Sequence, residues 1–304
     1  MSSTPPCTLC GGTSATLLFP GNIGEDIGSR FSQYAYYDDI FRCDSCGLVV
    51  QRRRHDLDVI AALLKAEKYL DEAIGTLNLI EKHVQFEALI RLIEKHRGLS
   101  GVRLLDVGAN TGVFLKTVKD RVGTARGVEP SREAAAQARS QGLDVQAGLL
   151  ANAVLDDQAF DVITLFDVIE HLTDPGADLA TLFRKLAPGG AIFISTHDIG
   201  SLLARLSGPH YPMLMYQHFY HFTPRTLSAL LEKTGFRVLG YDRFLKSWSV
   251  EYLYNLIAKK WPDSGLARRF EALLSPLLRV PAIRRARITS PQRDFFLLAA
   301  EKPR

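Results

Sequence analysis

The stretch from Leu104 to Gly112, with the sequence LLDVGANTG, constrains the fold more than any other part of this chain. Residues 104–107 have the apolar character of a short buried strand, and the glycine-rich turn that follows leads into a helical pattern from Val113. Glycine permits positive φ angles and lets backbone N–H groups come close to a ligand. The stretch therefore predicts a strand, a ligand-binding turn and a helix, the unit from which doubly wound α/β sheets are built.

An acidic residue follows this turn at the distance expected for a bound nucleoside. Glu129 ends the next apolar strand, at residues 125–128, and lies 17 residues after Gly112. A carboxylate in this place can accept hydrogen bonds from both hydroxyls of a ribose, as it does in dinucleotide-binding folds. We therefore expect a nucleoside-containing cofactor with its ribose on Glu129.

Strand and helix patterns alternate along the rest of the chain. Strands are expected near residues 103–107, 125–128, 144–147, 162–166 and 191–196, followed by two late strands at 236–241 and 295–300. This order predicts a doubly wound, seven-stranded, Rossmann-like α/β sheet over residues 101–304, with residues 244–293 inserted in its terminal hairpin. Ligands of such sheets bind at the carboxyl ends of the strands.

Four segments, in this order, resemble the motifs of class I S-adenosylmethionine-dependent methyltransferases. The spacing Asp106-x-Gly108-x-Asn110-x-Gly112 resembles motif I, in which a glycine usually stands at the position of Asn110. The segments GVEPS at 127–131, FDVITLFDVIEHL at 160–172 and LAPGGAIFIS at 186–195 resemble motif II, the fourth strand with its loop, and the turn into the fifth strand. Nicotinamide cofactors use Gly-x-Gly-x-x-Gly instead, so the pattern favours S-adenosylmethionine over NAD.

The resemblance implies which part of the cofactor each residue of the turn and of the strand ends would contact. The backbone from Gly108 to Gly112 would meet its amino-acid end, while Gly148 and Leu149 would lie near the adenine. Phe166 and Asp167 would lie near the sulfonium. The expected cofactor-binding set is Asp106, Gly108, Asn110, Gly112, Glu129, Pro130, Gly148, Leu149, Phe166 and Asp167.

The four cysteines of the chain form two pairs, Cys7-Thr8-Leu9-Cys10 and Cys43-Asp44-Ser45-Cys46, and a glycine follows each pair. A glycine there allows a tight turn that aims two thiolates at one ion, and four thiolates make the tetrahedral site that structural zinc prefers. We expect a zinc ribbon over residues 1–51. Two disulfides, unconnected thiols and an iron–sulfur cluster are the alternatives, of which disulfides are disfavoured in a reducing cytoplasm.

The charge distribution disfavours nucleic acid as a partner of the ribbon. Residues 1–50 hold two arginines against five acidic residues, whereas phosphate binding needs clustered Lys and Arg. Residues 244–293 carry ten Lys/Arg against three acidic residues and both tryptophans, Trp248 and Trp261. This insertion is expected to be a dimer or lid surface, with contact to an anionic membrane as the alternative.

The remaining expectations concern the linker and the location. Residues 52–100 carry helical apolar patterns, and leading helices commonly cover the cleft in class I methyltransferases, so this region is expected to be a lid, or a spacer for the ribbon. The chain shows no apolar run of 18 residues and no signal-peptide pattern at its N-terminus. We therefore expect a cytoplasmic protein, with the inner face of the membrane as a second location.

A histidine-rich stretch from His210 to His221 follows the fifth strand and is expected to cover the methyl acceptor. It resembles the Glu-His-x-x-x-Phe segment of zinc-ribbon-bearing deoxysugar C-methyltransferases, except that Gln217 stands where a glutamate is usual. It also resembles the His-Phe-Thr/Ser-Pro segment in methyltransferases of surface-polysaccharide and natural-product clusters. The missing glutamate favours O-methylation of a sugar, a glycan or a small hydroxylated metabolite over C-methylation.

Imidazole titrates near neutral pH, so the general base is sought among the histidines. His218 is preferred because it takes the place of the base-bearing histidine in the resembling segment. His221 and His171 are the other candidates, and a purely structural role for all three stays open.

The alternative functions are a sugar C-methyltransferase, an RNA methyltransferase, an S-adenosylmethionine-binding protein without turnover and an NAD-dependent enzyme.

Overall fold

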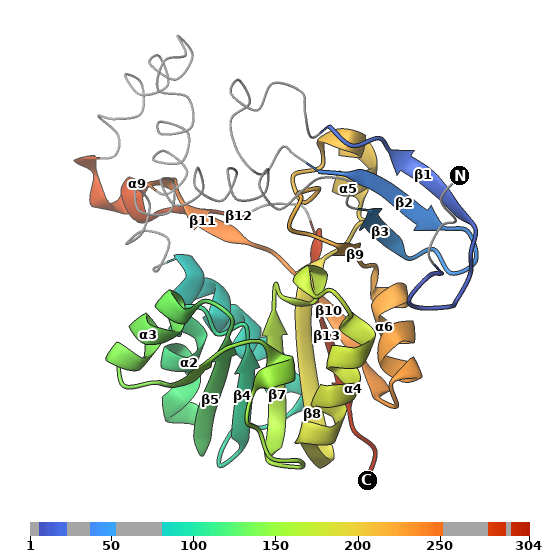
Figure 1. Ribbon diagram of the computed structural model, residues 1–304. Helices are drawn as coiled ribbons and strands as arrows, with labels where there is room; N and C mark the ends of the chain where they lie inside the picture. The colour runs from blue at the N-terminus through green and yellow to red at the C-terminus, as the bar shows by residue number, and fades with distance from the viewer. Residues whose placement is uncertain (1–5, 23–36, 53–80, 252–278, 290–292) are drawn as a thin grey trace.

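The computed structural model describes residues 6–22, 37–52, 81–251, 279–289 and 293–304 (Figure 1). Residues 53–80 of the predicted linker and residues 252–278 of the predicted insertion, which include Trp261, lie outside the described residues.

The main body is a seven-stranded sheet, as predicted. Its strands are β4 (Arg103–Val107), β5 (Thr124–Glu129), β6 (Asp144–Ala147), β7 (Phe160–Phe166), β8 (Leu186–His197), β10 (Arg237–Phe244) and β13 (Phe295–Glu301). They lie in the order β10-β13-β8-β7-β4-β5-β6. The pairs among β4 to β8 are parallel, whereas β13 is antiparallel to both β8 and β10. The doubly wound α/β fold is therefore confirmed.

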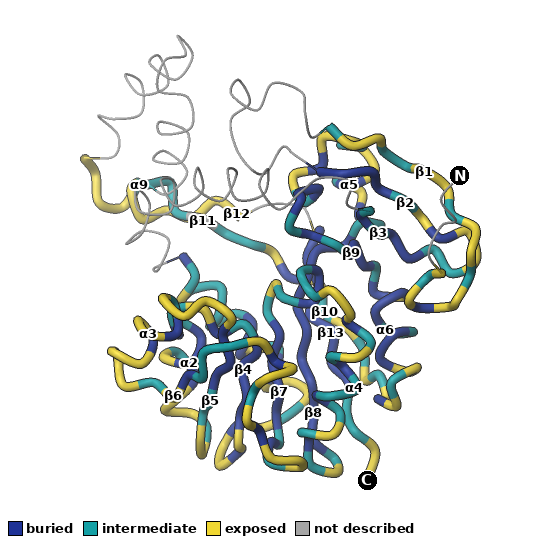
Figure 2. Tube along the Cα trace, in the orientation of Figure 1, coloured by how far each residue is buried: buried dark blue, intermediate teal, exposed yellow. Residues whose placement is uncertain are grey.

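Helices cover both faces of this sheet. They are α2 (Val113–Val118), α3 (Arg132–Ser140), α4 (Pro175–Lys185), α6 (Pro224–Lys233) and the helical residues 81–96. Successive residues of the central strands face opposite layers: Leu104 packs with α2, α3 and residues 81–96, and Leu105 packs with α4 and α6. Burial on both faces explains why these strands are apolar throughout, and Figure 2 shows them as the buried centre of the molecule.

Two of these helices begin at the residues that the sequence predicts. The Asp174 side chain accepts a hydrogen bond from the backbone N–H of Ala177 at the start of α4. Thr223 and Thr226 form a reciprocal capping box at the start of α6. A proline occupies the first turn of each helix, where its missing N–H costs nothing.

A second sheet joins the N-terminal ribbon to the main body. It contains β1 (Ala15–Phe19), β2 (Asp39–Cys43), β3 (Val49–Arg52) and the short strand β9 (Tyr220–His221), in that order and all antiparallel. Because β9 belongs to the histidine-rich stretch, the ribbon is held on the main body by backbone hydrogen bonds. Figure 1 shows the ribbon at the edge of the main sheet where the parallel strands end.

The remaining elements are short. They are η2 (Lys119–Arg121), η3 (Leu150–Asn152), η4 (Ile169–His171), α5 (Leu202–Ser207), η5 (Gly208–His210), β11 (Ser247–Ser249), α9 (Pro281–Arg285) and β12 (Arg287–Thr289). Strands β11 and β12 pair with each other between β10 and β13, where the insertion leaves and re-enters the terminal hairpin. Among the residues described, no helix has the length and apolar character needed to cross a membrane.

Candidate active site and cysteine cluster

The turn after β4 has the conformation that a close ligand contact requires. Gly108, Asn110 and Gly112 have φ angles of 77°, 49° and 82°, in the left-handed region that glycine adopts freely and asparagine tolerates. A Cβ atom on Gly108 would lie 2.4 Å from a methyl carbon of Val168. Asn110 thus keeps the left-handed backbone even though it replaces the glycine usual in motif I.

Glu129 is fixed beside this turn. One of its carboxylate oxygens accepts a hydrogen bond from the backbone N–H of Asn110, and the other accepts one from Ser131, both at 2.8 Å. The residue is buried at the end of β5. Each carboxylate oxygen has a second lone pair, so the geometry fits a carboxylate that receives the two hydroxyls of a ribose.

A cavity of about 220 Å³ opens at this edge of the sheet. The end of β4, the turn after it and the start of α2 contribute Asp106, Gly108, Ala109, Asn110, Val113 and Phe114. The end of β7, the loop after it and β8 contribute Phe166, Asp167, Val168 and Ser195. The remaining lining residues are Lys82, Gln85, Phe86, Leu89, Phe244 and Lys246. Five predicted cofactor residues therefore line one cavity. The other five, which are Gly112, Glu129, Pro130, Gly148 and Leu149, do not line it.

Aromatic side chains form one wall of the cavity. The ring of Phe114 lies 5.4 Å from that of Phe86 and 4.8 Å from that of Phe166. Phe86 belongs to the helical residues 81–96, which also contribute Lys82, Gln85 and Leu89 to the lining. This end of the predicted lid region thus covers the cavity.

Asp106 is a buried carboxyl group on the floor of the cavity. It accepts a hydrogen bond of 2.7 Å from the hydroxyl of Thr164. Burial, more than any other cause, raises the pKa of Asp106 to about 7. A buried carboxylate is stabilised by a neighbouring cation, so this position fits a ligand that carries positive charge, as S-adenosylmethionine does.

Asp167 is held at the end of β7 in an unusual backbone conformation, with a φ angle of 53°. Its backbone N–H donates to the carbonyl of Ser195, and its carboxylate pairs with the ammonium group of Lys246 at 3.1 Å. Strained backbone of this kind persists where surrounding contacts fix it, commonly at functional sites. Lys246 follows β10 outside every recognised motif, so no sequence pattern points to it.

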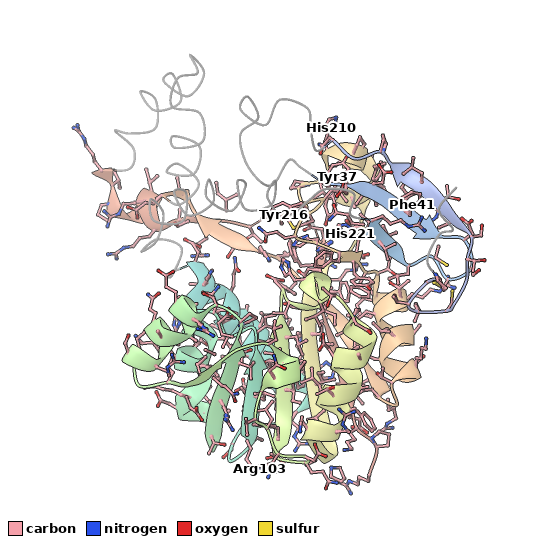
Figure 3. The ribbon with its side chains drawn as sticks, in the orientation of Figure 1. Tyr37, Phe41, Arg103, His210, Tyr216 and His221 are labelled. Atoms are coloured by element: carbon pink, nitrogen blue, oxygen red, sulfur yellow. The ribbon has the colours of Figure 1, made fainter. Side chains whose placement is uncertain are left out.

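The three predicted catalytic histidines come together, and His197 at the end of β8 joins them. The rings of His171 and His197 lie 4.7 Å and 5.0 Å from that of His218, and His197 Nε2 is 2.9 Å from His221 Nδ1. Figure 3 places His221 where the ribbon meets the main sheet, far from Arg103 at the start of β4. None of the four histidines lines the 220 Å³ cavity.

Burial decides the protonation of this cluster. It lowers the pKa of His197 and His218 well below the usual value, and it lowers the pKa of His221 to about 3. These three imidazoles are therefore neutral at physiological pH, and each ring has one nitrogen with a lone pair. Burial also raises the pKa of the neighbouring Glu170 to about 8, and the charge of Asp167 adds to this effect.

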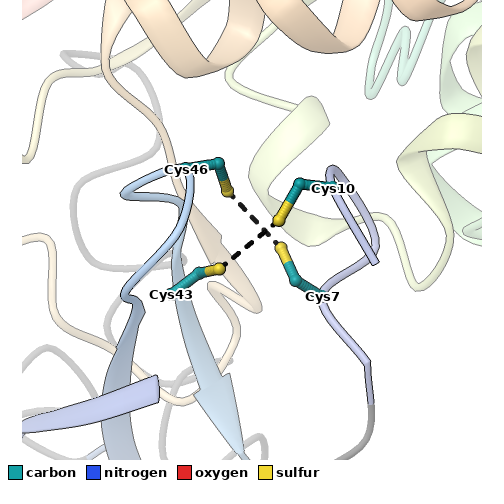
Figure 4. A group of neighbouring side chains, drawn as sticks. All are labelled: Cys7, Cys10, Cys43 and Cys46. Atoms are coloured by element: carbon teal, nitrogen blue, oxygen red, sulfur yellow. Dashed lines mark hydrogen bonds between the residues drawn. The ribbon is translucent and has the colours of Figure 1, made fainter. Parts of the chain in front are cut away.

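The four cysteine thiols of the ribbon converge on one point (Figure 4). The sulfur atoms of Cys7 and Cys46 are 3.6 Å apart, and those of Cys10 and Cys43 are 3.5 Å apart. Tetrahedral zinc with Zn–S bonds of about 2.3 Å places its sulfur ligands about 3.8 Å apart, whereas a disulfide bond measures about 2.05 Å. The donor set and its spacing therefore fit zinc, and the four cysteines are free thiols in this structure.

Both cysteine pairs use the same turn. The N–H of Gly11 donates to the carbonyl of Cys7, the N–H of Gly47 donates to that of Cys43, and both glycines have a φ angle near 80°. Burial opposes ionisation of Cys43, but hydrogen bonds from the backbone N–H groups of Cys46 and Ser45 lower its pKa to about 6. Backbone donors of this kind stabilise a thiolate, the form that binds metal.

Comparison with known proteins agrees with this geometry. Residues 78–240 match the methyltransferase domain family. The chain is similar to the ubiquinone biosynthesis O-methyltransferase of Aeromonas salmonicida (29% identical over 161 residues, 48% of this chain and 68% of that protein). It is also similar to the protein of that name from Pseudomonas fluorescens (30% over 114 residues, 35% of this chain and 49% of that protein).

Solved structures with a similar chain trace include a methyltransferase from Thermotoga maritima, described as a possible histamine N-methyltransferase (TM-score 0.49, 18% identical, 82% of this chain and 100% of that chain). The family match covers more than half of the chain and contains the glycine turn, Glu129 and Asp167. The chain therefore belongs to the methyltransferase domain family and is a class I S-adenosylmethionine-dependent methyltransferase.

Proposed function

We propose that this enzyme transfers the methyl group to a hydroxyl group of a sugar, a glycan or another small hydroxylated acceptor. The observation that carries the proposal is the cluster of four histidines, His171, His197, His218 and His221. A hydroxyl oxygen becomes a strong nucleophile only as its proton leaves, and a neutral histidine is the usual acceptor. The relatives described above are named O-methyltransferases, which supports the same reaction class.

S-adenosylmethionine, when bound, supplies an already activated methyl group, so the task of the protein is to bind and orient both reactants. In this proposal the backbone at Gly108 holds the amino-acid end of the cofactor, Glu129 holds its ribose, and Asp106 offsets its positive charge. Phe166 belongs to the apolar wall that keeps water from the methyl group. Removal of the acceptor proton is assigned to the histidine cluster, with His218 as its central member.

C-methylation of a sugar is less well supported. The glutamate of the resembling C-methyltransferase segment is replaced by Gln217, whose side-chain N–H₂ donates to the hydroxyl of Tyr216. The backbone carbonyl of Gln217 accepts a hydrogen bond from Nδ1 of His171. An amide cannot act as the general base that a carboxylate supplies, so this position offers no help in removing a proton from carbon.

We also propose that the four cysteines hold one structural zinc ion, since all four tetrahedral positions are then filled by the protein. The ribbon carries β3, which pairs with β9 at the edge of the histidine cluster. The metal would therefore stabilise the loop that contains His218, without taking part in methyl transfer.

The test is transfer of a labelled methyl group from S-adenosylmethionine to a panel of acceptors: nucleotide sugars, free glycans, phenols, amines and RNA. We expect label in a hydroxylated small molecule, and carbon-13 NMR of the product to show an O-methyl group. Replacement of His218 by alanine should lower turnover by about 10²–10⁴-fold with unchanged cofactor affinity. Label on carbon, on nitrogen or in RNA would contradict the proposal.

A further inference from the structure

Buried polar atoms without a protein partner gather at one place. Among the described residues, five buried side-chain nitrogen or oxygen atoms make no hydrogen bond, and four of them belong to Glu170, Thr196, His197 and His221. Glu170 is only 2% exposed. Buried polar groups are nearly always paired. The concentration of unpaired atoms here therefore points to a binding site whose ligand would pair with them.

Glu170, His171 and His218 can each direct one ligand atom to a common point. These atoms lie within 4.8 Å of one another. Nδ1 of His218 is 2.8 Å from the carbonyl oxygen of Met213, and Nδ1 of His171 is 3.0 Å from that of Gln217. A carbonyl oxygen only accepts, so each Nδ1 carries the proton and each Nε2 carries the lone pair. Histidine ligands of metals are typically oriented by this kind of hydrogen bond.

We propose that Glu170, His171 and His218 bind a divalent transition-metal ion such as zinc or iron(II), separate from the cysteine cluster. Two imidazoles and one carboxylate suit these ions and leave coordination positions open for other ligands. Magnesium is a poorer fit, because it prefers oxygen ligands.

A second group of three, His197, His218 and His221, is also compact. Its geometry is less suitable, because His197 Nε2 and His221 Nδ1 already share a hydrogen bond of 2.9 Å and no carboxylate belongs to the group. His197 instead stacks on the ring of His218, with an interplanar angle of 19°. In the proposed site the ring of His197 would orient the ring of His218 by stacking on it.

The site lies next to the cofactor cavity. Glu170 is three residues beyond Asp167 and two beyond Val168, both of which line that cavity. An ion here would bind the acceptor oxygen and lower the pKa of its hydroxyl group, as metal ions do for bound water. This consequence rests on the proposed function; with Nε2 of His218 on the ion, the ion and not His218 would promote loss of the acceptor proton. Metal binding itself is independent of the acceptor.

The experiment measures metal content and cobalt spectra of the full-length chain, with no acceptor present. The protein is treated with a chelator, refilled with cobalt(II) or zinc(II), and separated from free ion. We expect two ions per chain. The cobalt bound by the cysteines should show intense sulfur-to-metal charge-transfer absorption, and the second ion should show only weak visible bands.

Variants assign the second ion to its ligands. Glu170→Gln and His171→Ala should each retain the sulfur-bound ion and weaken binding of the other by at least tenfold. His210→Ala, a change to an exposed histidine outside the cluster, should keep both. Circular dichroism and adenosylhomocysteine binding verify that each variant is folded.

Wild-type protein without the second ion, or with a second ion unaffected by Glu170→Gln, would overturn the proposed site. If the wild-type protein holds no second ion, His218 stays available as a free base, and the proposal of O-methylation is unaffected. Conversely, two ions per chain without label in any hydroxylated acceptor would support the metal site and count against the proposed function.

Discussion

Replacing Asp106 by asparagine should stabilise the cofactor-free protein more strongly at high pH than at low pH. The pKa of Asp106 is raised from 3.8 to about 7 in the folded chain, chiefly by burial. Between these two values the folded state binds more protons than the unfolded state, so this residue makes the free energy of unfolding fall as pH rises. Asparagine keeps an oxygen that can accept from Thr164, and it has no charge to desolvate.

The magnitude follows from the two pKa values. At about 1.4 kcal/mol for each pH unit of separation, the raised pKa of Asp106 costs the fold about 4 kcal/mol at pH 8.5 and about 1.5 kcal/mol at pH 5. The buried amide of asparagine has its own cost, but that cost does not depend on pH. The effect of Asp106→Asn on unfolding free energy should therefore be more favourable at pH 8.5 than at pH 5, by about 2.5 kcal/mol.

Urea denaturation of both proteins at the two pH values, without cofactor, measures this difference. Asp161→Asn is the matched control, because hydrogen bonds from Arg103 lower the pKa of Asp161. Its pKa lies below 3.8 in the folded chain, so Asp161→Asn should have the same effect at pH 5 as at pH 8.5, and should become less harmful only as the pH falls below about 4. Equal effects of Asp106→Asn at pH 5 and pH 8.5 would show that Asp106 is not a desolvated carboxylate.

Three further outcomes are expected. Glu129→Ala should weaken adenosylhomocysteine binding by about 1–3 kcal/mol in calorimetry, because it removes the acceptor assigned to the ribose; unchanged affinity would refute the assignment. Gly108→Ala should lower the free energy of unfolding by about 1–3 kcal/mol, whereas Gly98→Ala, which meets no neighbour and has no positive φ, should not; thermal denaturation compares the two. Gln51→Ala should speed hydrogen exchange at residues 213–221, because the Gln51 side-chain N–H₂ donates to three carbonyls of that loop; unaltered exchange there would mean that the ribbon does not hold the loop.

The strands of the main sheet could be predicted because their signal is local. Residues 103–107 and 144–147 are apolar or alternating segments bounded by turns, and both strands have the predicted bounds. Strand β8 begins at Leu186, five residues before the predicted start at 191. Its first residues, LAPGG, have the composition of a turn, and the register against β7 shifts there, between Phe160 and Val162. The pairing with β7, and not local propensity, extends this strand.

The contacts that complete the site could not be predicted, because they join segments far apart in the chain. Lys246 reaches Asp167 only because β10 and β13 pair beside β8. The pairing of Val49 with His221 likewise has no local pattern, since β9 consists of two residues. The sequence identified His218 as a candidate. It did not indicate that His197 stacks on His218 and shares a hydrogen bond with His221.

The fourth strand of the ribbon sheet has a consequence for the order of folding during synthesis. The ribbon leaves the ribosome first, but β9, which pairs with β3, follows about 170 residues later. Until then β3 presents an unpaired edge, the kind of surface through which nascent chains associate wrongly. The proposed zinc site needs no residue beyond Cys46, whereas docking needs β9. The N-terminal module should therefore reach its final form only after strands β4 to β8, which precede β9 in the sequence, have been synthesised.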